Sequence, residues 1–276
     1  MTIKTAIQKR LHSSKSTTEI VDDSFAGEYQ HLAHIFSSIG IPIEYVIDIA
    51  ASDGVTQSCT YPFYKQGANG IALEMDPSKF ASLSATYASF PEVILLRTRV
   101  TPSTIGTLLT SLDCPLNPSL LNLDIDSFDL ELIEAILGTG IRPAVISMEI
   151  NEKIPPPIYF SVKYDQDRYW AGDHFYGCSL TAASSIVKPF GYFLESLQFN
   201  NAIFIRSDYQ KSTADLSALD AYTRGYVLRP DRELLFPWNQ DFDNVIEMDT
   251  EDALKFISEF FEPYSGAYDL YISGAE

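Results

Sequence analysis

The chain has little positive charge, few cysteines and no long apolar run. Its 276 residues carry 19 Lys and Arg against 37 Asp and Glu, a net charge of −18, which argues against nucleic acid as a partner. The three cysteines form no CxxC pair, which argues against a disulfide framework or zinc site and favours a cytoplasmic location. No stretch approaches the roughly 18 apolar residues of a membrane span, and the polar start does not resemble a secretory signal.

The glycine motifs of nucleotide binding are also missing. After the first predicted strand only Gly54 remains, and Ala50 and Ala51 stand where the glycines of a GxGxxG turn would be. This argues against a dinucleotide fingerprint, which needs close backbone contact with a pyrophosphate. No GK[ST] occurs either, which excludes a P-loop.

Short apolar runs alternate with segments of helical periodicity along the first 150 residues. This alternation predicts a doubly wound α/β fold with a mostly parallel seven-stranded sheet. An antiparallel hairpin that turns at Asn200–Asn201 is expected to close one edge. Strands are predicted at 45–51, 70–75, 92–98, 119–125, 143–150, 191–199 and 201–207. Helices are predicted at 27–41, 55–66, 77–89, 101–112, 128–140 and 179–189.

Small and acidic residues follow the first two strands. Asp48 lies near the end of the first, and Ala50, Ser52 and Gly54 lie in the small-residue turn around and after that end. Ligands of open α/β sheets bind beyond the carboxyl ends of the strands, where small residues let a ligand approach the backbone. Glu74 ends the second strand, where a carboxylate can accept both hydroxyls of a ribose, although acids before Pro77 also suit helix capping.

The segment from Val46 to Leu83, with IDIAASDG and IALEMDP, resembles the cofactor-binding half of FkbM-type methyltransferases. The resemblance covers residues 45–150 and, in outline, 178–207. It implies a class I, Rossmann-like fold that binds S-adenosylmethionine. It places Asp48, Ala50, Ser52 and Gly54 around the methionine part of the cofactor and Glu74 on its ribose. Met75 is also expected to contact the cofactor. Ala50 departs from the family, where a glycine is usual.

The predicted organisation has three parts. Residues 1–24 form a polar arm, and residues 25–210 form the Rossmann-like domain. A long aperiodic segment within that domain, 151–178, is expected to be a substrate loop. Residues 211–276 are expected to form a helical extension packed on the same domain.

Acidic residues also end the fourth and fifth strands. Asp124 and Asp126 follow the fourth strand and Glu149 ends the fifth, so all three are expected at one edge of the sheet. One interpretation is a general base, with Asp124 and Glu149 as catalytic residues. A second is a site for Mg²⁺ or Ca²⁺ formed by all three, because these ions prefer oxygen ligands. A third is helix capping by Asp126 and Asp129.

His174, in the aperiodic segment, is the third predicted catalytic residue, because an imidazole there could act as a base; a hydrogen-bonded loop histidine is the alternative. Six aromatic residues of the segment could form the wall of a ring-shaped substrate such as a sugar. They are Tyr159, Phe160, Tyr169, Trp170, Phe175 and Tyr176.

Together these features predict a methyltransferase that acts on an O or N nucleophile of a small molecule, with a carbohydrate as the preferred acceptor. The alternatives are a nicotinamide-dependent oxidoreductase, which the missing glycines weaken, and a catalytically silent nucleoside- or carbohydrate-binding domain. A homo-oligomer remains open, with the aromatic segment as its interface.

Overall fold

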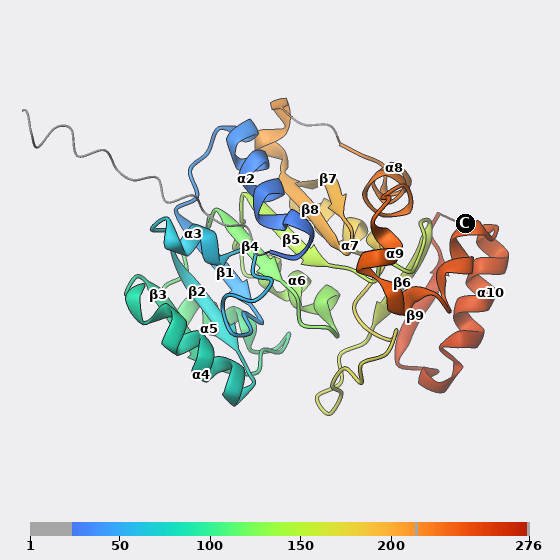
Figure 1. The fold of residues 1–276 in the computed structure, drawn as a ribbon, viewed down its shortest axis with the longest axis horizontal. Coiled ribbons are helices and arrows are strands. Elements are labelled where there is room, and N and C mark those ends of the chain that lie inside the picture. The colour runs from blue at the N-terminus through green and yellow to red at the C-terminus, as the bar shows by residue number, and fades with distance from the viewer. Residues whose placement is uncertain (1–23, 213–214, 275–276) are drawn as a thin grey trace, which may run out of the picture.

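The computed structural model describes residues 24–212 and 215–274. Apart from Ser24, the predicted polar arm lies outside the described residues. The architecture is a central sheet between two layers of helices, with a smaller lobe near the C-terminus (Figure 1).

The central sheet has seven strands in the order β3-β2-β1-β4-β5-β8-β7, which confirms the predicted fold class. The first five are parallel, and β8 pairs antiparallel with both β5 and β7. The expected hairpin is present, but its turn is Phe199–Asn200, because Asn201 already pairs with Gln198. The strands are β1 Tyr45–Ile49, β2 Asn69–Glu74, β3 Val93–Arg97, β4 Leu120–Leu123, β5 Val145–Glu149, β7 Tyr192–Gln198 and β8 Asn201–Arg206.

Helices cover both faces of the sheet because the strands bury side chains on both sides. In β1, Ile47 and Ile49 belong to one apolar core, whereas Val46 belongs to the other. The first core contains helices α5, α6 and α7 with residues of α8, and the second contains α2, α3 and α4. The helices are α2 Glu28–Ile39, α3 Tyr61–Lys65, α4 Pro77–Thr86, α5 Ile105–Ser111, α6 Asp129–Gly138, α7 Leu180–Val187, α8 Ala218–Tyr222, α9 Arg232–Leu235 and α10 Thr250–Phe260.

Two helices begin later than predicted because polar side chains hold the preceding residues in turns. Before α3, the Asp53 carboxylate accepts hydrogen bonds from the backbone N–H groups of Val55 and Thr56. Before α5, the Thr101 and Thr104 hydroxyls lie 2.8 Å apart and close a turn. Both turns compete with helical hydrogen bonding, as short hydroxyl and carboxylate side chains commonly do.

The aperiodic segment and the C-terminal extension contain a second sheet, which corrects two predictions. Strand β6, Ile158–Val162, pairs antiparallel with β9, Tyr268–Ile272, in a two-stranded sheet. Phe160, Phe175 and Phe261 form part of a separate apolar core with α10. Residues 151–178 are therefore partly a strand, and residues beyond 211 are not wholly helical.

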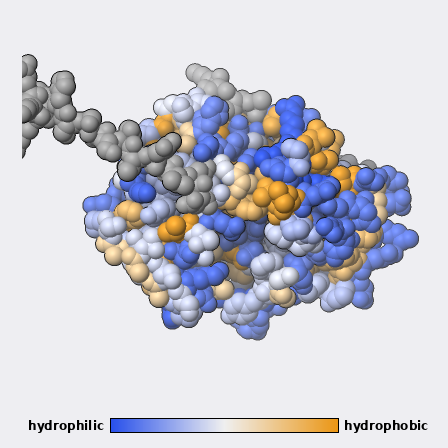
Figure 2. Space-filling view, viewed as in Figure 1, coloured by the Kyte–Doolittle hydropathy of each residue, from blue (hydrophilic) through white to orange (hydrophobic). Residues whose placement is uncertain are grey.

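The outer surface is mostly hydrophilic on the face that Figure 2 shows, with smaller hydrophobic groups between the polar residues. Large apolar side chains exposed in the C-terminal part are Leu219, Leu228, Leu234, Trp238 and Tyr271. Within the described residues, no helix combines the length and apolar composition of a membrane span.

Candidate active site

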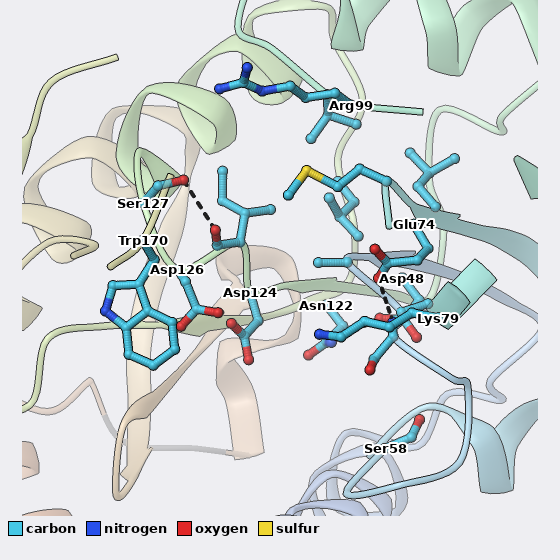
Figure 3. Close-up of a pocket in the computed structure, with 18 of the residues that line it drawn as sticks. Asp48, Ser58, Glu74, Lys79, Arg99, Asn122, Asp124, Asp126, Ser127 and Trp170 are labelled. Atoms are coloured by element: carbon cyan, nitrogen blue, oxygen red, sulfur yellow. Dashed lines mark hydrogen bonds between the residues drawn. The ribbon is translucent and has the colours of Figure 1, made fainter. Parts of the chain in front are cut away.

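A cavity of about 540 Å³ opens at the carboxyl ends of β1, β2 and β4 (Figure 3). This is the edge at which doubly wound sheets bind ligands, and the volume falls within the range of small-molecule sites. One part is lined by the turn after β1 and the end of β2. The other is lined by the residues that follow β4 and by Arg168, Tyr169 and Trp170.

Asp48 lies at the base of the cavity and is almost fully buried. Its carboxylate accepts hydrogen bonds from the Thr60 hydroxyl at 2.6 Å and from Asn122 Nδ2 at 3.0 Å. Burial raises the pKa of Asp48 above its usual range, although these two hydrogen bonds oppose the shift. The side chain is thus held in one orientation at the end of β1.

The backbone of the turn after β1 lies along the cavity, and two of its residues have a left-handed conformation. Ala50 and Ser52 both line the cavity and both have positive φ, 68° and 52°. Ala50 therefore adopts the left-handed conformation that glycine prefers, at a cost of roughly 1–2 kcal/mol.

Gly54 does not line the cavity, contrary to the prediction that it contacts the cofactor. A Cβ at this position would lie 2.5 Å from Leu83 Cδ1 and 2.6 Å from Tyr87 Cε1. Its φ is +82°, and its carbonyl accepts a hydrogen bond from the Tyr87 hydroxyl at 3.0 Å. Glycine is required here for packing of the turn against α4 and the residues after it.

Glu74 lines the cavity at the end of β2, and its two carboxylate oxygens orient the surrounding backbone. One accepts from the backbone N–H of Ser52 at 2.9 Å, and the other from that of Asp76 at 2.7 Å. The helix cap of α4 is Asp76, which accepts from Ser78 and Lys79, so Glu74 does not cap this helix. Met75 is half exposed at the rim of the same cavity.

The acidic residues after β4 and β5 lie together as predicted. Oxygen atoms of Asp124, Asp126 and Glu149 all lie within 4.8 Å of one another. Burial, followed by the charges of Asp126 and Asp129, raises the pKa of Asp124 to about 8. Burial also raises the pKa of Asp126 and, together with Asp124, that of Glu149. We refer to Asp124, Asp126 and Glu149 as the acidic triad.

Asp126 is not a helix cap, whereas Asp129 has a related structural role. Asp126 adopts φ 55° and lines the cavity, as does Asp124. The fully buried Asp129 carboxylate accepts from the backbone N–H groups of Ile125 and Ser127 at 2.9 and 3.1 Å. Asp129 therefore shapes the turn that carries the two cavity aspartates.

Glu149 contributes an oxygen without a partner. Its Oε1 accepts a hydrogen bond from Asn200 Nδ2 at 3.0 Å, while its buried Oε2 has no hydrogen-bond partner. The side chain is only 7% exposed. An unpaired buried acceptor is costly, which makes this atom a candidate ligand-binding atom.

Several residues that line the cavity had not been singled out from the sequence, among them Arg99, Asn122 and Lys79. The Arg99 guanidinium donates to the backbone carbonyls of Gln166 and Arg168, and its carbon lies 4.5 Å from the centre of the Tyr169 ring. Arg99 thus fastens residues 165–173, here called the cavity loop, at the mouth of the cavity. Because Arg99 contacts a loop some 70 residues further along the chain, no local sequence pattern indicates this role.

His174, predicted to be catalytic, does not line the cavity that Asp124 lines. Its Nε2 lies 3.0 Å from Asp241 Oδ1, and its ring contacts Phe242 and Phe260. The imidazole therefore packs against the second lobe, an environment that fits the alternative of a hydrogen-bonded loop histidine. The cavity loop reaches the site instead through Arg168, Tyr169 and Trp170.

Glu152, just beyond β5, belongs to a buried network of its own. Its carboxylate accepts from Lys153 Nζ at 3.2 Å, the Tyr176 hydroxyl at 2.7 Å and Asn239 Nδ2 at 2.6 Å. The network joins the segment after β5 to the C-terminal part. Lys153 holds the pKa of Glu152 below its usual range despite burial.

No protein-family model and no curated protein sequence matches the chain. Among solved structures, similar ones include magnesium protoporphyrin IX methyltransferase from Synechocystis PCC 6803 with bound SAH (10% identity, TM-score 0.43, 66% of this chain and 83% of that one). A second is an S-adenosylmethionine-dependent methyltransferase from Clostridium acetobutylicum ATCC 824 (8% identity, TM-score 0.42, 74% of this chain and 99% of that one). A third is the N-terminal domain of EvdMO1 with SAH bound (10% identity, TM-score 0.40, 74% of this chain and 95% of that one). These likenesses are distant, and the FkbM-type resemblance stays a prediction.

Proposed function

We propose that this chain transfers a methyl group from S-adenosylmethionine to an O or N nucleophile of a small molecule, with a carbohydrate as the preferred acceptor. The observation that carries the proposal is the cavity, which is lined by an ordered turn, the strand-end Glu74 and the two aspartates of the triad, with Glu149 beside them.

The part of the cavity around β1 and β2 suits the methyl donor. The Glu74 oxygens are already oriented by two backbone N–H groups and retain lone pairs that can accept ribose hydroxyls. Asp48 and the Ala50–Ser52 turn would face the methionine part, whose amino group an ionised carboxylate favours. When bound, S-adenosylmethionine supplies an activated methyl group on a sulfonium.

The part beyond β4 suits the acceptor. Asp124 lines this part of the cavity and would accept the proton of the acceptor, because a carboxyl with a pKa near 8 is a stronger base than an ordinary aspartate. Trp170 and Tyr169 are about half exposed, line the same part of the cavity and offer ring faces that a sugar could contact. The chain's contribution is to orient the nucleophile, exclude water and accept one proton.

Calorimetric titration with S-adenosylhomocysteine tests the donor half of this proposal. We expect micromolar binding, and Glu74→Ala should weaken it about 10- to 100-fold, because loss of a charged acceptor costs about 1.5–3 kcal/mol. Glu92→Ala, at an exposed position just before β3, is the matched control and should bind as the wild type does. Unchanged affinity in a folded Glu74→Ala variant would remove Glu74 from the site.

A further inference from the structure

The acidic triad brings three carboxyl groups into close contact at the ends of β4 and β5. Its three carboxyl groups lie within 4.8 Å of one another, and Glu149 Oε2 is buried without a hydrogen-bond partner. Like charges this close destabilise one another unless a proton or a cation is shared between them. The arrangement therefore favours a positively charged group.

The basic residues nearby supply that charge only in part, through Lys79, which lines the cavity and lowers the pKa of Asp126. Lys79 and Lys153 act on Asp126, but Lys153 Nζ is bound by Glu152 and the Tyr176 hydroxyl. Arg99, which also lines the cavity, is turned to the carbonyls of the cavity loop. Among the residues that the structure describes, no ion pair joins a Lys or Arg to the triad.

The cavity places an aromatic face beside these carboxylates. Trp170 lies next to Asp126 in Figure 3, and both line the same cavity. Its indole N–H donates to the Asp173 carbonyl at 2.7 Å, which fixes the ring. Carboxylates on one side and an indole on the other form a combination that binds ammonium groups through hydrogen bonds and cation–π attraction.

We propose that the methyl acceptor carries a protonated amine, which the cavity binds between Asp124, Asp126 and Trp170 and methylates on nitrogen. This inference rests on the proposed function. An ammonium brings a full charge and up to three N–H donors to the triad, whereas a hydroxyl brings one donor and no charge. A divalent metal also binds carboxylate oxygens and completes its shell with water, so the titrations include Mg²⁺ and Ca²⁺ as competitors.

The reaction balances with the groups present. The bound cation favours the ionised form of Asp124, which then accepts one proton from the ammonium nitrogen. The freed lone pair forms the N–C bond to the methyl carbon as the C–S bond breaks. The electron pair of that bond stays on sulfur, so the products are the methylated amine and S-adenosylhomocysteine.

Two matched probe pairs test this inference by calorimetry on the full chain. Glucosamine is compared with glucose, and benzylamine with benzyl alcohol, each with and without S-adenosylhomocysteine. In at least one pair the amine should bind about 10- to 100-fold more tightly, as expected for hydrogen bonds to a charged group. Asp126→Asn should remove most of that preference, and Asp252→Asn, at an exposed position on α10, should preserve it.

The outcomes separate this inference from the proposed function. Equal binding within both pairs, or no amine binding at millimolar concentration, would overturn it. Tight binding of Mg²⁺ or Ca²⁺ that is lost in Asp126→Asn, and that the amines do not displace, would also overturn it and assign the triad to a metal. Failure of S-adenosylhomocysteine to bind contradicts only the proposed function, because the titrations without it still measure the amine preference.

Discussion

Replacing Asp124 by Asn should stabilise the fold at alkaline pH while it impairs catalysis. Burial and two neighbouring aspartates raise the pKa of Asp124 from 3.8 to about 8. The unfolded chain therefore loses this proton at lower pH than the folded chain does. Wild-type stability falls as pH rises from about 4 to about 8, and asparagine removes that loss.

The magnitude follows from the pKa difference. Each pKa unit corresponds to about 1.4 kcal/mol, so the full shift would cost on the order of 5 kcal/mol. Because Asp124 is reached by solvent through the cavity, we expect a gain of about 1–3 kcal/mol at pH 8.5 and a smaller gain at pH 5. Urea denaturation at both pH values measures it, with Asp252→Asn as the control. Equal stability changes at the two pH values would refute the reasoning.

Three further predictions concern residues around the site. Gly54→Ala should lower the free energy of unfolding by about 1–3 kcal/mol, because the methyl group of the alanine would meet Leu83 and Tyr87. Urea denaturation measures the loss, and an unchanged free energy of unfolding would contradict the packing role of Gly54. His174→Ala should lose about 1 kcal/mol of stability but keep wild-type turnover, and a large rate loss would restore it to the site. Arg99→Gln should speed proteolytic cleavage of the cavity loop, and an unchanged rate would mean that other contacts fasten the loop.

The central sheet was predictable because its strands are buried on both faces. Such strands appear as short apolar runs, and each of the seven runs became a strand. The position of Glu74, Asp124 and Glu149 at one edge of the sheet was predictable for a related reason. Parallel strands end at one edge, so acids at several strand ends are expected in one crevice.

The second sheet was missed because its pairing is not local. Ile158 in β6 pairs with Ile272 in β9, and the proline run just before β6 obscured the apolar residues that follow it. The location of His174 away from the cavity was missed for the same reason. Asp173 binds the Tyr264 hydroxyl and the backbone N–H of Phe175, which turns this part of the chain toward the second lobe. No pattern within residues 151–178 contains that information.

Backbone strain gives an argument for the site that is independent of any resemblance. Seven non-glycine residues of the described chain have positive φ, and four of them line the cavity: Ala50, Ser52, Gln57 and Asp126. Each such conformation costs about 1–3 kcal/mol and persists only where the surrounding structure enforces it. These four residues follow two different strands, β1 and β4, yet they converge on one space. A fold that holds strain and uncompensated acids at the same strand ends is better explained by selection for ligand binding than by selection for stability.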